Sequence, residues 1–143
     1  MASRATKSLY DTDFAEWSAR TAALIRSGRF NEIDAESVAE EIEDLGKSER
    51  SAAWSHLSRL LLHKIKQVLQ PERDCASWWV SIASSRQAIR RLIQSSPSLR
   101  PYIQQNLQEI YQDALELALI ETGLEHAAVP DECPWDLDTL LHG

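Results

Sequence analysis

The chain has 143 residues, of which 43% are hydrophobic and 26% are charged. This length and balance are typical of one globular domain with a packed core. The low numbers of glycine (4) and proline (5) exclude a collagen-like chain, and no apolar stretch approaches the roughly 18 residues of a membrane span. Residues 1–7 also lack the apolar core of a signal peptide, so we expect a cytoplasmic protein that does not associate with membranes.

The charges are distributed unevenly along the chain, although they sum to −7. Residues 1–46 hold 5 basic and 10 acidic side chains, residues 47–101 hold 10 and 3, and residues 102–143 hold none and 9. The ordinary interpretation is that acidic helices pack beside a basic middle segment. The alternative is a basic surface that binds an anionic partner, although the acidic total argues against nucleic acid.

The first predicted helix begins at Asp13, which has the spacing of a capping box to Glu16, and ends at Gly28. Its apolar stripe, which we expect to face the core, consists of Phe14, Trp17, Thr21, Leu24 and Ile25. In the connector that follows, Phe30 and Ile33 are expected to fill the core.

The second predicted helix is capped by Asp34 and ends before Pro71, because the residue before a proline disfavours helix. Its apolar stripe shifts by about 100° around the axis after Gly46. The helix therefore either bends at Gly46 or runs on and buries different faces at its two ends. Residues 60–62 are all leucine, which favours one long central helix.

Two more helices are predicted in the second half of the chain. One is capped by Asp74 or Ser77 and is broken by the Ser- and Pro-rich residues 95–98. The other begins near Pro101 and ends at Gly123.

The tail after Gly123 is expected to be extended, with one helical turn at Asp136–Leu141 that Trp135 and Leu137 pin to the body. The sequence therefore predicts an all-α fold, a helical bundle of four main helices with an extended, partly helical C-terminal tail. We expect a single domain over 1–143, with its core between about 9 and 141 and with residues 1–8 flexible.

Short motifs spread from Leu9 to Leu141 add a family resemblance. They are Tyr10–Phe14 with Trp17, Glu40–Gly46, Gln70–Arg73, Ser77–Trp79, Ser96–Tyr102, Glu121–Leu124 and Cys133–Trp135. Together they resemble a bacterial family of uncharacterised proteins, the domain of unknown function twenty-nine. The resemblance implies an all-helical fold, and it implies no established activity, ligand or catalytic residue.

A polar row interrupts the apolar pattern of the long helix. Glu49, His56 and His63 are seven residues apart and share one helix face, about 10 Å apart along the axis. Two histidines at this spacing cannot bind one metal ion without ligands from another helix. A hydrogen-bonded row at the border of the core is therefore the main interpretation, and a metal or ligand site is the alternative.

Glu40 and Glu43 form an E-x-x-E pair, a spacing that can hold a hard cation such as Mg²⁺. The comparable second pair is Asp113 and Glu116, and the sequence does not show whether the two pairs face each other. The ordinary interpretation is a solvated acidic face. We therefore predict no definite metal site, and the cofactor stays unknown.

Arg86 lies within the apolar stripe of the helix that follows residue 74. An unpaired buried charge is costly, so we expect Arg86 to pair with a carboxylate, from Glu40, Glu43 or Glu49. The alternative is an anion-binding role.

The leading functional hypothesis is a small intracellular protein-interaction or accessory module without catalysis, which binds a protein partner or self-associates. No complete catalytic constellation can be assembled, and the five tryptophans are of a type enriched at interfaces. One alternative is a Mg²⁺- or Mn²⁺-dependent enzyme that acts on a nucleotide or phosphate compound through Glu40 and Glu43. Another is an anionic-ligand or nucleic-acid binder that uses the basic middle segment.

Overall fold

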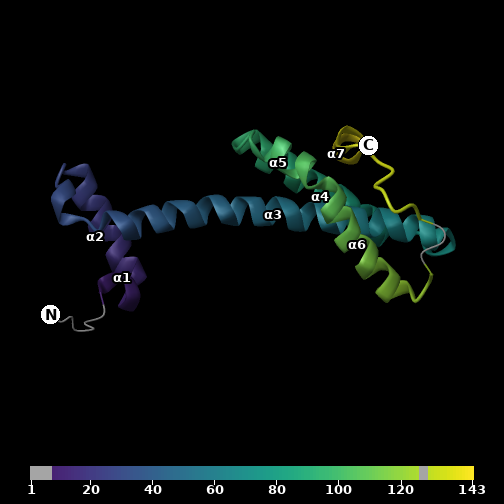
Figure 1. The fold of residues 1–143 in the computed structure, drawn as a ribbon, viewed down its shortest axis with the longest axis horizontal. Coiled ribbons are helices and arrows are strands. Elements are labelled where there is room, and N and C mark those ends of the chain that lie inside the picture. Colours follow the sequence, from purple (N-terminus) through teal and green to yellow (C-terminus); the bar gives the residue numbers. More distant parts are fainter. Residues whose placement is uncertain (1–7, 126–128) are drawn as a thin grey trace. The chain divides into compact units, whose positions relative to one another are not determined.

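The computed structural model describes residues 8–125 and 129–143, and it confirms the all-α fold. The helices, shown in Figure 1, are α1 (Leu9–Thr12), α2 (Phe14–Arg26), α3 (Ala35–Leu69), α4 (Ala76–Ser95), α5 (Leu99–Gln105), α6 (Leu107–Thr122) and α7 (Leu137–His142). Two single 3₁₀ turns, Phe30–Glu32 and Pro71–Arg73, accompany them. In the part of the chain that is described, no helix is long and apolar enough to cross a membrane.

The chain divides into two compact units, an N-terminal unit (Met1–Gly46) and a C-terminal unit (Lys47–Gly143). The boundary lies inside α3, at the glycine where the sequence leaves open a bend or a continuous helix. The helix is continuous in its hydrogen bonding from Ala35 to Leu69. Whether the two units fold as one domain, as the sequence predicts, stays a prediction.

The predicted helix boundaries of the N-terminal unit are confirmed by their caps. The Asp13 carboxylate accepts a hydrogen bond from the Glu16 amide at 3.0 Å, at the start of α2. Asp34 accepts from the Ser37 amide at 3.3 Å, in the first turn of α3. After α2, Gly28 takes a positive φ of 76°, a conformation that glycine adopts without steric cost.

The hydrophobic core belongs to the C-terminal unit. Every apolar side chain that is buried in the described residues lies between Ala53 and Leu141. The side chains with no exposed surface are Leu57, Leu60, Leu61 and Ile65 of α3, Ile89 of α4, Ile103 of α5, Ile110 and Tyr111 of α6 and Leu140 of α7, together with several alanines. The three consecutive leucines therefore do mark a central helix, with Leu62 packed at the edge of this core.

Two predicted boundaries in this unit are wrong. Cys75 stands at the N-cap of α4, without a side-chain cap bond. The Asp74 carboxylate instead accepts hydrogen bonds from the Trp79 indole at 2.9 Å and from Gln67 at 3.1 Å. The predicted helix from Pro101 to Gly123 is also interrupted at Asn106, whose side-chain amide donates to the Tyr102 carbonyl at 2.8 Å. The Tyr102 carbonyl also accepts from the Asn106 amide at 3.3 Å, so the side chain shares the acceptor of a helical hydrogen bond.

The C-terminal tail is fixed as predicted, with a short helix and an aromatic anchor. Asp136 caps α7 by accepting from the Thr139 amide at 2.7 Å, and Leu137 is buried. The Trp135 ring packs edge-on against Tyr111, with ring centroids 6.3 Å apart. The Tyr111 hydroxyl donates to the Pro130 carbonyl at 2.6 Å, so α6 holds both ends of this segment.

Tyr111 should make the stability of the protein depend on pH under alkaline conditions. Burial, together with smaller contributions from the negative charges of Cys133 and Asp131, raises the pKa of Tyr111 to about 12. In the unfolded chain the phenol ionises near pH 10. The stabilisation by the neutral phenol is therefore complete below about pH 10 and is lost as the pH rises toward 12.

We expect Tyr111→Phe to lower the free energy of unfolding by about 1 kcal/mol at pH 8, because the hydrogen bond to Pro130 is lost. The difference from the wild type should shrink between pH 10 and 12. Urea unfolding of both proteins across this range measures it, and a difference that stays constant would contradict the assignment.

Candidate functional site

Residues 8–46, the described part of the N-terminal unit, bury no large apolar side chain. Among its described residues only Thr21 and Ser37 are buried. Apart from Thr21, the predicted core stripe of α2 is half-buried or exposed, and Phe30 is 63% exposed rather than filling a core. The unit therefore folds with its apolar side chains at the surface, and this contradicts the predicted burial of the stripe.

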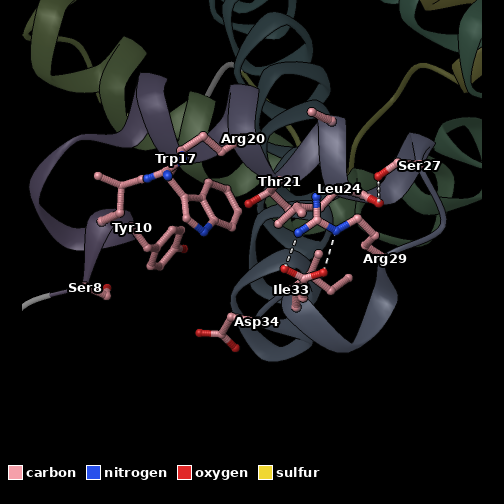
Figure 2. A pocket seen from close by; sticks show the side chains of 13 residues that line it. Ser8, Tyr10, Trp17, Arg20, Thr21, Leu24, Ser27, Arg29, Ile33 and Asp34 are labelled. Carbon is pink, nitrogen blue, oxygen red and sulfur yellow. Dashed lines mark hydrogen bonds and ion pairs between the residues drawn. The ribbon is translucent and has the colours of Figure 1, made fainter.

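Between the first helices of this unit lies a groove of about 770 Å³ rather than a packed core. It is bounded by α1, α2 and the segment 29–34, all from the N-terminal unit. Its apolar lining consists of half-buried Leu9, Trp17, Leu24 and Ile33 with exposed Ala23, and Tyr10 adds a partly polar ring. Figure 2 shows Tyr10 and Trp17 at one end of the groove and Arg29 with Ile33 at the other.

The charged groups around the groove are held by local partners. The Arg29 guanidinium forms a two-pronged ion pair with Glu32, which includes an Nη2–Oε1 distance of 2.6 Å (Figure 2). This hydrogen bonding lowers the pKa of the Glu32 carboxyl. The Asp34 carboxylate accepts from the Ser37 hydroxyl at 2.7 Å, which lowers its pKa as well. These charges therefore fix the rim of the groove but contribute little stability, because both ion-paired side chains are exposed.

Tyr10 connects the first helices to α3. Its hydroxyl donates to the Glu41 carboxylate, and this hydrogen bond raises the pKa of Tyr10 well above its usual value. The Tyr10 ring also lies 4.6 Å from the Trp17 ring and 6.0 Å from the Phe14 ring, measured between centroids. A surface aromatic cluster thus joins α1 and α2 and is tied to the first turns of α3.

The α3 segment of this unit is acidic and partly apolar. Residues 35–46 hold five carboxylates and no Lys or Arg. Between these carboxylates, Ile42 is 63% exposed and Leu45 is 69% exposed. Glu40 and Glu43 are exposed here, whereas their predicted counterparts Asp113 and Glu116 belong to the C-terminal unit. Within residues 8–125 and 129–143, no group of three or more His, Cys, Asp or Glu side chains is placed to hold a metal ion.

The polar row of α3 lies in the C-terminal unit, and its members have separate partners. The Glu49 carboxylate accepts from the Ser96 hydroxyl at 2.5 Å, next to the end of α4. The Nδ1 atom of His63 lies 2.9 Å from the Arg59 carbonyl of its own helix. His56 is half-buried between them along the helix. The structure therefore does not gather Glu49, His56 and His63 around one point.

Arg86 has a different partner from the predicted carboxylate, and that prediction is wrong. Its Nε donates to the Leu140 carbonyl at 2.7 Å, and Arg90 donates to the Leu141 carbonyl at 2.9 Å. Glu49, the candidate partner in the same unit, is bound to Ser96. Carbonyls in the last turn of a helix lack intrahelical partners and carry partial negative charge. Two arginines of α4 therefore satisfy the end of α7, in place of an ion pair.

The residues that line the groove were not among the sites predicted from the sequence. The apolar residues of α2 have the spacing of a buried helix face, so the sequence pattern does not reveal that most of them are partly or fully exposed. The available signal lies on α3, where the positions that face α1 and α2 are polar. Ser37 is buried and its hydroxyl donates to Asp34, and Glu41 accepts from Tyr10 of α1, so these positions of α3 form hydrogen bonds where a core would need apolar side chains.

We expect Arg86→Met to detach α7, because the Leu140 carbonyl then loses its donor while the apolar stem is kept. The free energy of unfolding should fall by about 1–3 kcal/mol. Arg91→Met, at an exposed position on the same helix, is the matched control and should change it by less than about 0.5 kcal/mol. Equal stability of the two variants, measured by urea unfolding, would show that the hydrogen bond from Arg86 to the Leu140 carbonyl does not stabilise the protein.

The comparisons with known proteins identify a family without identifying an activity. The model of the family described as Domain of unknown function DUF29 matches residues 9–143. No curated protein and no solved structure matches the chain. The match extends over both units and includes every residue that lines the groove except Ser8. The chain therefore belongs to the DUF29 family of domains of unknown function.

Proposed function

We propose that the protein is a non-enzymatic interaction or accessory module, whose N-terminal unit binds a helix of a partner protein. The observation that carries the proposal is that the large apolar side chains of this unit's described residues are half-buried around a groove or exposed, as Ile42 and Leu45 of α3 are. Exposed apolar surface of this kind is typical of interaction sites.

The energetics favour a partner over an empty surface. Fully burying one large apolar side chain is worth about 1.5–3 kcal/mol. Phe14, Ile42 and Leu45 are all at least half exposed, and Leu24 and Ile33 line the groove. A partner that covers a few of these side chains would supply the apolar burial that the unit does not achieve alone.

Backbone chemistry indicates a helix as the docking element. A partner that binds as an extended strand needs an exposed sheet edge for its backbone hydrogen bonds. The described residues contain no strand, so no such edge is offered in that part of the chain. A helix satisfies its own backbone groups and presents side chains at helical spacing to an apolar groove.

Charge complementarity indicates that this helix is basic. The first turns of α3 carry five carboxylates without a cation, and the nearby cations Arg20 and Arg29 are already paired with Glu16 and Glu32. Lys and Arg on the flanks of the apolar face would complement this field and speed the encounter. We further propose that this interaction takes place in the cytoplasm.

A photo-crosslinking amino acid at Leu24, introduced in the native host, tests the proposal. We expect one defined cross-linked polypeptide whose cross-linked segment is an amphipathic helix rich in Lys and Arg. The same amino acid at Glu109, an exposed position on α6, is the control and should not give this product. Identical products from both positions, or a product without such a segment, would contradict the proposal.

A pair of variants assigns the cross-link to the exposed apolar surface. Ile42→Ser with Leu45→Ser should abolish the product at Leu24, because the apolar contact with the partner is removed. Leu117→Ser with Ile120→Ser alters side chains on α6 that are 50% and 71% exposed, and should leave the product intact. Loss of the product in both variants, or in neither, would show that Ile42 and Leu45 do not bind the partner.

A further inference from the structure

A second hollow, in the C-terminal unit, combines aromatic rings with unpaired cations. It is a shallow hollow of about 320 Å³, open to solvent, and is lined by Lys47, Arg50, Ser51, Trp54, Ser55 and Tyr102. Five of these residues lie on one side of α3, and Tyr102 comes from α5. No carboxylate is among them, which is unusual for the surface of a chain with a net charge of −7.

The two rings form an apolar wall that is fixed before any ligand arrives. The Trp54 and Tyr102 centroids are 6.5 Å apart, with the ring planes inclined by 50°. Both side chains are half-buried and pack against the hydrophobic core. Their positions are therefore set by the packing of α3 on α5, and one part of each ring is left at the surface. A planar group can stack on such a ring without reorganising the protein.

The polar groups around the rings have spare bonding capacity. Within residues 8–125 and 129–143, neither Lys47 nor Arg50 forms an ion pair, and the hydroxyls of Ser51 and Ser55 form no hydrogen bond. Two cations three residues apart on a helix lie on the same side, and like charges so placed repel each other. A doubly charged anion would relieve this repulsion and accept their N–H groups.

We propose that this hollow binds a nucleoside monophosphate. The phosphate would lie against Lys47 and Arg50, the base would stack on Trp54 with the inclined Tyr102 ring at its edge, and the ribose hydroxyls would meet Ser51 and Ser55. The volume lies at the lower end of small-molecule sites, about 300–1,000 Å³, which suits a mononucleotide better than a dinucleotide. The site is separate from the groove of the N-terminal unit and does not depend on the proposed docking of a partner.

Isothermal titration of the full chain with AMP, GMP, CMP and UMP tests the proposal. We expect saturable binding of at least one of them, with a Kd below about 1 mM. For the nucleotide that binds, the parent nucleoside and ribose 5-phosphate should each bind at least about tenfold more weakly, because each lacks one of the two recognised groups. No saturable binding up to several millimolar for all four nucleotides would overturn the proposal.

Matched variants assign the binding to these residues. Arg50→Ala should weaken nucleotide binding about tenfold or more, since it removes a charge-assisted hydrogen bond. Arg59→Ala, at an exposed position on the same helix outside the hollow, should leave it unchanged. An equal loss of nucleotide affinity in both variants would show that only the overall charge of the protein matters, and it would overturn the assigned site.

A second pair of variants tests whether the base stacks on Trp54. Trp54→Leu keeps an apolar side chain against the core and should weaken nucleotide binding while leaving the weak binding of ribose 5-phosphate unchanged. Trp79→Leu, 58% exposed on α4, is the control. An unchanged nucleotide affinity in Trp54→Leu would show that no base stacks there, and circular dichroism of each variant checks that the fold is retained.

Discussion

The unequal burial of apolar surface is the constraint on which the rest of this structure depends. The C-terminal unit buries leucines and isoleucines from all of its helices around one core, whereas residues 8–46 of the N-terminal unit bury only Thr21 and Ser37. Burial of apolar surface is the dominant favourable term in folding. The N-terminal unit is therefore held by caps, a Tyr10–Glu41 hydrogen bond and a surface aromatic cluster. These interactions hold α1, α2 and the start of α3 together around a groove instead of a packed core.

The two units differ in the same way in how they satisfy polar groups. In the C-terminal unit, long-range side-chain bonds close the structure, as Arg86 and Arg90 do at the end of α7 and Tyr111 does at Pro130. In the N-terminal unit, the charged groups bond mostly within one turn, as Arg29 does with Glu32. Short-range bonds define a local shape but couple few elements together. A shape of this kind can accept a partner without first breaking a core.

Much of the fold could be predicted because caps and breakers are local signals. Asp13, Asp34 and Gly123 have the roles that their residue types favour, and helix α3 ends before Pro71 as expected. The break at Asn106, whose side chain also bonds the Tyr102 carbonyl, does not follow from the apolar periodicity, which continues from α5 into α6. The cap of α4 was misassigned because Asp74 is engaged by Trp79 and Gln67.

The sites were harder to predict than the fold, because their partners are distant in sequence. Arg86 was correctly identified as an arginine on an apolar face that requires a partner, but its acceptor is a backbone carbonyl 54 residues away. The candidates Glu40 and Glu43 lie on the acidic turns of α3, close in sequence to the exposed Ile42. Their E-x-x-E spacing was the sole basis for suggesting that they bind a cation. An apolar stripe at helical spacing identifies the face of a helix but not whether another element covers it.

Native-state hydrogen exchange of the isolated protein tests most directly the claim that the N-terminal unit lacks a core of its own. Amides in the middle of α2, around Thr21, should exchange through local opening at a free energy well below that of the whole protein. Amides in the middle of α6, around Ala114, should exchange only through global unfolding, because they lie in the buried core. Equal protection of α2 and α6 would contradict the account, since it would require a hidden source of stability in the N-terminal unit.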